Sequence, residues 1–158
     1  RNDEEGLART LASLVGAAVE GVVREVIVCD QGSTDGSGRV AEEAGCVWLP
    51  AGGAAEGVRL AKSEWLLFLE PGATLEDGWT ESAARHVARA AMAGRFSRAH
   101  KARTPFLKRI VAGNRALVEG LLITRRQALS RKGQGGEAIA RGLATKRLDG
   151  EIVPARRK

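Results

Sequence analysis

The stretch Glu25-Val-Ile-Val-Cys-Asp-Gln-Gly-Ser-Thr-Asp-Gly36 joins a short apolar run to a loop of small and polar residues. The run is rich in Val and Ile and has polar neighbours on both sides, which predicts a buried strand. Asp30 follows the run, and Gly32 lets the backbone approach a ligand closely. Ser33 and Asp35 are typical acceptors for the N–H groups at a helix start. Two interpretations stay open: Asp30 accepts an N–H of a nucleobase, or it caps a plain strand-to-helix turn.

Short apolar runs and amphipathic segments alternate along the rest of the chain. Strands are expected over residues 25–29, 46–49, 65–69, 119–123 and 151–153. Helices are expected over residues 4–18, 37–44, 54–62, 80–93, 106–118, 125–130 and 136–144, with Thr80 as a cap. This alternation predicts an α/β fold with a mostly parallel, Rossmann-like sheet and helices on both faces. Ligands of such sheets bind at the carboxyl ends of the strands, which is where Asp30 is expected.

The composition indicates one globular domain, because 44% of the residues are hydrophobic and 28% are charged. The most apolar run, residues 65–69, is far too short to cross a bilayer. Cys29 and Cys46 stand in apolar runs, so we expect buried thiols and a cytoplasmic location. His86 and His100 lack the spacing of a metal-binding pair, and we expect His86 on the surface.

Charge divides this single domain, residues 1–158, into two halves. Residues 1–84 hold six Lys or Arg against 15 Asp or Glu, and residues 85–158 hold 19 against four. The balances of −9 and +15 predict that the second half meets an anionic partner: a diphosphate, an acidic lipid surface or nucleic acid. A solvated basic surface explains the same charges. Aromatic residues, 4% of the chain, are too scarce to favour base stacking on aromatic platforms.

Three blocks, in their order and spacing, resemble the family 2 glycosyltransferases of the GT-A type. They are Asn2-Asp-Glu-Glu5, the stretch over 25–36, and Trp65-Leu-Leu-Phe-Leu-Glu-Pro-Gly-Ala-Thr-Leu75, which leads to Trp79. The middle block is the most specific, and the likeness covers residues 1–80 well and 117–158 loosely. In that family an apolar strand precedes the first block, so we expect this sequence to begin after that strand.

The resemblance implies a nucleoside diphosphate sugar, with UDP or GDP as the nucleotide, bound at the sheet edge. The family's loop carboxylate, here Asp30, contacts the base. The backbone of its first block, here Arg1 and Asn2, lies against the nucleotide, and Gly32 and Ser33 complete this set. The sugar goes to a hydroxyl acceptor. A lipid-linked acceptor, reached by contact with the inner membrane surface, is one candidate.

The resemblance also implies a divalent cation, Mn²⁺ or Mg²⁺, held by an Asp-x-Asp motif after the third strand. Glu70-Pro71-Gly72 stands at that place, so one acid of the motif remains and glycine replaces the other. Hard cations take oxygen ligands, and Glu70 is therefore the predicted metal ligand, with phosphates and water completing the coordination.

A later acid at the start of a helix serves that family as the base for the acceptor hydroxyl. Glu137 is the candidate here, offset by about one position, and a solvated residue at a helix start is the alternative. Basic side chains are expected to neutralise the leaving diphosphate. The candidates are Arg125, Arg126, Arg131 and Lys132.

Three functions follow, in order of preference. The first is a glycosyltransferase that moves a sugar from a nucleoside diphosphate donor to a hydroxyl acceptor. The second is a nucleotide-sugar-binding domain with impaired catalysis, because the acids near Glu70 and Glu137 are only partly retained. The third is a basic protein of membrane surfaces or nucleic acid, suggested by the balance of +15 in the second half. The basic stretch over 95–109, which includes Phe96 and Phe106, could lie on anionic lipid or be an ordinary basic loop. The lack of an RNA-binding motif makes nucleic acid the least favoured partner.

Overall fold

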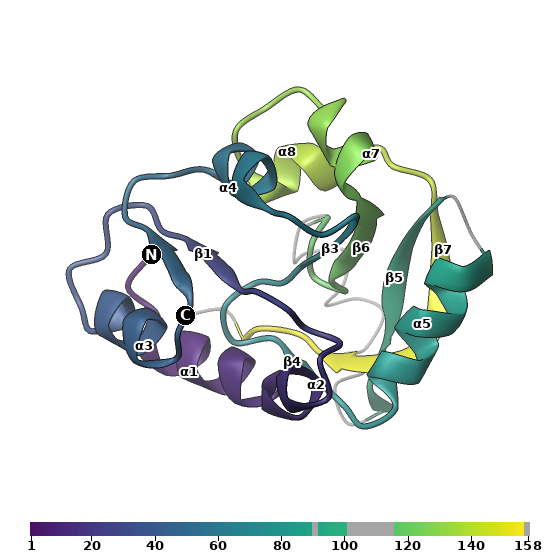
Figure 1. The fold of residues 1–158 in the computed structure, drawn as a ribbon, viewed down its shortest axis with the longest axis horizontal. Helices are drawn as coiled ribbons and strands as arrows, with labels where there is room; N and C mark the ends of the chain where they lie inside the picture. The colour runs from purple at the N-terminus through teal and green to yellow at the C-terminus, as the bar shows by residue number, and fades with distance from the viewer. Residues whose placement is uncertain (90–91, 101–115, 157–158) are drawn as a thin grey trace, which may run out of the picture.

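Two sheets form the centre of the fold, with helices on both sides of them (Figure 1). The structure is a computed structural model that describes residues 1–89, 92–100 and 116–156. The smaller sheet pairs β1 (Ile27–Cys29) with β2 (Val47–Leu49) in parallel. The larger sheet has the order β3-β6-β5-β7-β4 and is antiparallel except where β5 pairs with β7. Its strands are β3 (Trp65–Phe68), β4 (Thr74–Leu75), β5 (Ala93–Arg98), β6 (Leu121–Thr124) and β7 (Thr145–Val153).

Short helices connect these strands. They are α1 (Glu4–Ala12), α2 (Val15–Val19), α3 (Ser37–Glu43), α4 (Ala54–Leu60), α5 (Trp79–Arg89), α7 (Arg125–Leu129) and α8 (Gly136–Ala140). Helices α1 and α3 pack together, α4 packs against α7 and α8, and α5 lies along β7 (Figure 1). No helix in the described part of the chain is long and apolar enough to cross a membrane.

The predicted α/β fold is confirmed, but the sheet is mixed rather than mostly parallel. Strand β5 was not predicted, because Arg95 and Arg98 interrupt its apolar residues. Only the last three residues of β7 were predicted, because Lys146 and Arg147 in its first part are charged and exposed. Pairing with neighbouring strands, rather than local propensity, makes these segments extended.

Two helix predictions differ from the structure at their ends. The helix expected over 4–18 is broken into α1 and α2 at Ser13, whose hydroxyl donates to the Thr10 carbonyl instead of facing water. Helix α5 begins at Trp79, so Thr80 lies inside the helix rather than capping it, and its hydroxyl donates to Glu81. The helix expected over 106–118 lies mostly outside the described residues.

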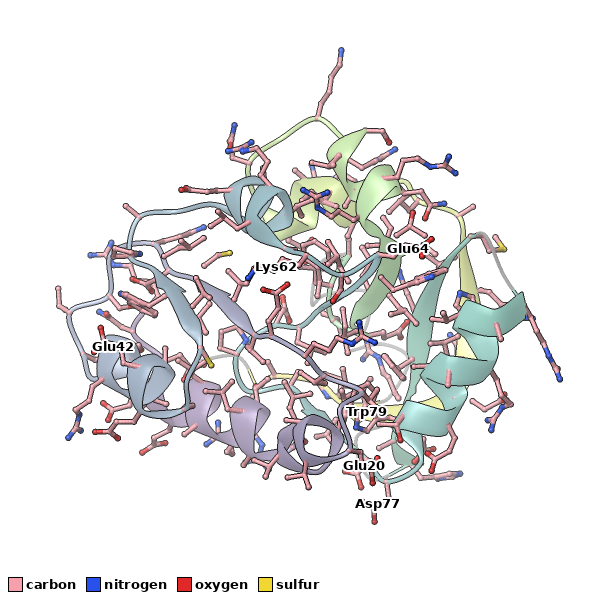
Figure 2. The ribbon with its side chains drawn as sticks, viewed as in Figure 1. Glu20, Glu42, Lys62, Glu64, Asp77 and Trp79 are labelled. Atoms are coloured by element: carbon pink, nitrogen blue, oxygen red, sulfur yellow. The ribbon has the colours of Figure 1, made fainter. Side chains whose placement is uncertain are left out.

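The larger sheet separates two apolar clusters. Residues of β6 alternate between them: Leu122 joins the cluster of Phe96 and Ile152, and Ile123 joins that of Ile139. In the first cluster, Trp79 at the start of α5 meets the Phe96 ring edge-on at 6.2 Å between ring centroids. Figure 2 shows Trp79 on the inner side of α5, whereas Glu20, Glu42 and Asp77 of the acidic half are exposed. The packed clusters fix the strands whose ends carry the candidate site.

Two side-chain expectations need correction. His86 is buried rather than on the surface: its Nε2 lies 2.8 Å from the Met92 carbonyl oxygen, and its ring meets that of Trp65 edge-on. Arg85 and Arg89 on either side of His86 in α5 suggested an exposed face in the sequence. Cys29 and Cys46 are half-buried rather than fully buried, and burial raises the pKa of both thiols.

Candidate functional site

Loops from distant parts of the sequence meet at one edge of the fold, beyond the carboxyl ends of β1 and β2. The Gly32 N–H donates to the Pro50 carbonyl at 3.1 Å, which joins the loop after β1 to the loop after β2. The Ala55 N–H donates to the Gln134 carbonyl at 3.1 Å and brings the glycine-rich loop over 131–135 to the same place. This edge is the position at which parallel α/β sheets bind ligands.

Asn2 ties the first block of the chain to the loop that follows β1. Its N–H donates to the Ser33 hydroxyl at 2.8 Å, and its side-chain oxygen accepts the Thr34 N–H at 2.8 Å. The backbone of Asn2 has φ 51°, a left-handed conformation that asparagine tolerates better than most residues. Asn2 therefore holds the loop after β1 in place, although Ser33 lies 31 positions further along the chain.

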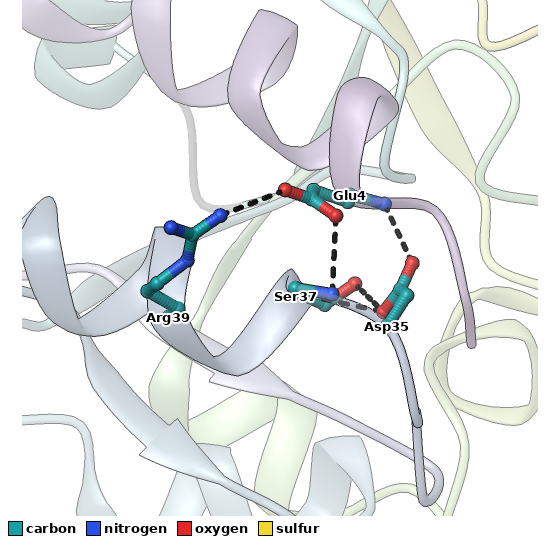
Figure 3. A network of polar contacts seen from close by, with 5 residues as sticks. Glu4, Asp35, Ser37 and Arg39 are labelled. Carbon is teal, nitrogen blue, oxygen red and sulfur yellow. Dashed lines mark hydrogen bonds and ion pairs between the residues drawn. The ribbon is translucent and has the colours of Figure 1, made fainter.

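Glu4 is linked to Asp35 and Gly36 in a similar way (Figure 3). The Glu4 N–H donates to the Asp35 carboxylate at 3.1 Å, and the Glu4 carboxylate accepts the Gly36 N–H at 3.1 Å. Asp35 also accepts the hydroxyl and the N–H of Ser37 at the start of α3, and Arg39 pairs with Glu4 at 3.6 Å. One carboxylate thus caps two helices, which confirms the helix-starting role expected of Asp35.

Asp30 is buried, with 7% of its surface exposed, directly after β1. Its carboxylate accepts both the N–H and the hydroxyl of Ser33. Burial acts to raise the pKa of Asp30, but the hydrogen bonds from Ser33 and from the Gln31 N–H outweigh burial and hold that pKa below its usual value. Asp30 is therefore a charged acceptor at neutral pH. Each carboxylate oxygen has a second lone pair, so a further N–H donor fits.

Acid is expected to destabilise this edge. Hydrogen bonds from Ser37 hold the pKa of Asp35 below the usual 3.8, and the pKa of Asp30 is lowered too. A carboxylate with a lowered pKa stabilises the fold fully above 3.8, and this contribution is lost as pH falls through the lower folded-state pKa. The free energy of unfolding should therefore drop below about pH 4, measured by urea titration at stepped pH. Asp35→Asn should flatten this acid limb; an unchanged slope in that variant would contradict the assignment.

Glu70 lies two residues beyond β3 and is half-buried. Gly72, at the place of the motif's second acid, has no side chain and has φ +90°. Among the described residues no group of three or more His, Cys, Asp or Glu gathers to hold a metal ion. Glu70 supplies one carboxylate, whereas a divalent cation takes about six oxygen ligands. The described protein groups alone therefore do not complete the coordination of such a cation, and phosphates and water would supply most of its ligands.

A side chain at position 72 is expected to cost stability whatever its charge. Gly72→Asp and Gly72→Ala should both lower the free energy of unfolding by about 1–3 kcal/mol, because φ +90° is a conformation that L side chains rarely adopt. Urea denaturation of the two variants and the parent chain measures the effect. The alanine variant is the control for the carboxylate, and an unchanged stability in Gly72→Ala would refute the backbone argument.

The four basic residues proposed for the diphosphate do not lie together. Arg125 and Arg126 follow β6 at the amino end of β3, because β6 runs antiparallel to β3. The Arg125 guanidinium donates to the carbonyls of Val58 and Arg59, at the end of α4. Figure 2 shows Glu64 on this opposite side, beside α7 and β6. Arg125 and Arg126 are therefore remote from the edge that carries Asp30.

The loop over 131–135 is at the correct edge. The Arg131 guanidinium donates to the Arg141 carbonyl at 2.6 Å, whereas Lys132 is exposed. Of the four proposed cations, Lys132 is thus the one whose side chain is both at the edge and exposed to solvent. Its role toward a diphosphate stays a prediction.

Glu137, the proposed base, lies in the first turn of α8 at the same edge. Gly136 beside it packs near Phe68, the last residue of β3. The Glu137 carboxylate accepts the N–H groups of Ala116 at 2.7 Å and Leu117 at 2.9 Å. The structure thus gives Glu137 a structural task, and its role as a base stays a prediction.

The described part of the basic stretch over 95–109 turns inward. Phe96 is fully buried, the Arg95 guanidinium donates to the Ala140 carbonyl, and Arg98 pairs with Glu119 at 3.0 Å. These residues are therefore not available as a membrane-facing surface. Lys101, Arg103, Lys108, Arg109 and Phe106 lie outside the described residues.

Sequence reasoning missed the connections that build the edge. The pairs Asn2–Ser33 and Glu4–Asp35 are long-range, and no local spacing signals them. The sequence does carry one signal for these pairs. Each of the two blocks has more polar side chains than are needed to cap a single helix. The hydrogen bond from the Ala55 N–H to the Gln134 carbonyl involves only backbone atoms, so no particular residue type is needed at either position.

Comparisons with known proteins agree with this geometry. The profile of glycosyl transferase family 2 matches residues 1–140. Glucosyl-3-phosphoglycerate synthase from Mycobacterium tuberculosis, in complex with Mn²⁺, UDP and glucosyl-3-phosphoglycerate, has a TM-score of 0.65 and 17% identity, over 99% of this chain and 70% of that one. Mannosyl-3-phosphoglycerate synthase from Rubrobacter xylanophilus has a TM-score of 0.65 and 14% identity, over 100% and 65%.

No curated protein sequence matches the chain significantly. At these identities the solved structures establish the fold, which is that of GT-A glycosyltransferases. The profile covers far more than half of the chain, including the first block, the loop after β1 and the turn after β3. The chain therefore belongs to glycosyl transferase family 2.

Proposed function

We propose that this chain binds a nucleoside diphosphate sugar beyond the carboxyl ends of β1 and β3 and transfers the sugar to a hydroxyl acceptor. The observation that carries the proposal is the buried, charged Asp30, held by Ser33, which in turn is tied to Asn2. A preorganised acceptor at this edge suits an N–H of a uracil or guanine base. Gly32, exposed and at φ +73°, leaves its backbone open to the ligand.

The proposed chemistry relies on the chain's own groups. Lys132 and the backbone of the loop over 131–135 would meet the leaving diphosphate, where a fixed cation stabilises developing negative charge. Glu137 would accept the proton of the attacking hydroxyl. The base and the phosphate-facing groups come from one loop and the helix after it, so a single segment would position both.

The acceptor that we propose carries an anionic group, because the second half of the chain has a balance of +15. Two chemical classes fit, a small phosphorylated hydroxy acid and a polyprenyl phosphate. The similar solved structures are synthases of glucosyl- and mannosyl-3-phosphoglycerate, which favours the first class. A cytoplasmic location is part of the proposal. If the acceptor is a polyprenyl phosphate, we expect the protein at the inner membrane surface.

Isothermal titration with UDP and with GDP tests the donor site. We expect one of the two to bind with one site per chain; no binding of either would overturn the proposal. Incubation of the UDP- or GDP-sugar with 3-phosphoglycerate or a polyprenyl phosphate then tests the acceptor, with the released nucleoside diphosphate as the readout.

A domain that binds the donor without transferring the sugar is the second candidate. Gly72 in place of an acid and the backbone bonds of Glu137 favour it. It predicts nucleotide binding with neither acceptor glycosylation nor donor hydrolysis. Any turnover above that of a heat-denatured sample would exclude it.

A further inference from the structure

The turn after β3 is locked to helix α1. The Gly72 N–H donates to the Gly6 carbonyl and to the Thr10 hydroxyl, both at 2.9 Å. The Thr10 hydroxyl in turn donates to the Ala73 carbonyl at 2.7 Å, and Thr10 is buried. Three bonds to one short turn fix how α1 presents its neighbouring side chains to the Glu70-Pro71-Gly72 segment.

Arg9 precedes Thr10 on this helix and reaches the same turn. Its Nη2 lies 3.8 Å from the point at which a Cβ on Gly72 would stand. The same point lies 3.4 Å from the Ala155 Cβ, so Ala155 and the Arg9 guanidinium both border the space beside Gly72. Arg9 also pairs with Glu5 at 3.8 Å, but both side chains are more than half exposed, so this pair holds the guanidinium only weakly.

The acidic residues around the turn after β3 make the position of Arg9 important. Residues 1–84, which include α1 and the turn after β3, carry six basic against 15 acidic residues, so a diphosphate at this turn needs cations in addition to Lys132. Arg39 pairs with Glu4 at 3.6 Å and is also more than half exposed, so Arg9 is chosen for its approach to Gly72 and not because Arg39 is occupied. A guanidinium offers up to five N–H donors in a fixed fork that matches phosphate oxygens.

A divalent cation and Arg9 are alternatives at this turn. The described protein groups offer one carboxylate, Glu70, and glycine stands where a second would project. A guanidinium nearby would repel a metal ion, whereas it attracts the same phosphate oxygens that a metal would bind.

We infer that Arg9 binds the diphosphate of the donor in place of a divalent metal ion, so that nucleotide binding by this chain is metal-independent. The inference rests on the proposed donor site and adds to Lys132 a second cation for the diphosphate. It also distinguishes this chain from the similar M. tuberculosis synthase, whose complex contains Mn²⁺ with UDP.

Titration of UDP and GDP in EDTA and in Mn²⁺ tests the inference. The nucleotide that binds the parent chain should do so with Kd values that agree within about twofold in the two buffers. In EDTA, Arg9→Gln should weaken binding about tenfold or more, the loss of a hydrogen bond to a charged group, and Arg9→Lys should retain part of the affinity. Arg85→Gln, which removes an arginine on α5 paired with Asp149, is the matched control and should not change the Kd.

The outcomes separate this inference from the donor site itself. If neither nucleotide binds the parent chain in either buffer, the proposed function fails. If the parent binds about tenfold more weakly in EDTA than in Mn²⁺, or if Arg9→Gln binds like the parent, the donor site stands and the role of Arg9 is refuted. Urea denaturation of each variant checks that the fold is retained. Arg9→Gln and Arg9→Lys should have the same unfolding midpoint, so that their difference in affinity reports the guanidinium and not the fold.

Discussion

Replacing Glu137 by alanine is expected to lower the free energy of unfolding by about 2–6 kcal/mol. The Glu137 carboxylate accepts the N–H groups of Ala116 and Leu117, and both of these residues are buried. Without the carboxylate, two buried donors lose their acceptor, and each costs about 1–3 kcal/mol. Urea denaturation of the parent chain and of Glu137→Ala measures the difference.

Glu137→Gln separates the structural role from the catalytic one. The amide oxygen can still accept an N–H, so the loss of stability should be less than in the alanine variant. An amide cannot take up the acceptor proton, and if Glu137 is the base, sugar transfer should fall by about 10²–10⁴-fold. Glu56→Gln, in the exposed first turn of α4, is the control and should change neither quantity. Full transfer activity in Glu137→Gln would remove Glu137 as the base.

The fold class and the position of Asp30 could be predicted from the sequence because both depend on local signals. An apolar run followed by a polar, glycine-containing loop predicts a strand and its carboxyl end. The structure places β1 over Ile27–Cys29 and Asp30 directly after it. The same reasoning located β3 within one residue, because four consecutive large apolar residues leave few alternatives to a strand.

The mixed sheet could not be predicted in this way. β5 begins with Ala93 and Gly94, which have little strand propensity, and is extended because it pairs with β6 and β7. Burial of Phe96 and Ile152 in one cluster, from strands distant in the sequence, decides that pairing.

The candidate site was predictable in its chemistry but not in its grouping. Asp30, Ser33 and Asn2 do meet, since they follow one strand or cap its loop. Arg125 was proposed for the diphosphate by its charge alone, yet the antiparallel direction of β6 carries it to the far end of β3. Charge can be counted in a sequence, whereas the edge at which a charge lies depends on strand direction.

Asp30→Asn is expected to weaken nucleotide binding by about tenfold or more, the typical loss of a hydrogen bond to a charged group. In the parent chain both carboxylate oxygens accept bonds from Ser33, and both still have a lone pair for the base. The asparagine side chain has a single oxygen and one NH₂ group. It therefore cannot accept the Ser33 N–H on one oxygen and the Ser33 hydroxyl on another, as the carboxylate does. If its oxygen faces Ser33, its NH₂ faces the N–H of the base, and two donors then oppose each other.

Ser33→Ala is the matched control for this prediction. It removes the hydroxyl that links Asn2 to Asp30 but leaves the charged carboxylate and its bond to the Ser33 backbone N–H. Isothermal titration should therefore show a smaller loss of affinity for Ser33→Ala than for Asp30→Asn, in EDTA and in Mn²⁺ alike. Equal losses would mean that loop shape, rather than the charge of Asp30, determines affinity. Binding by Asp30→Asn as tight as that of the parent would exclude Asp30 from contact with the base.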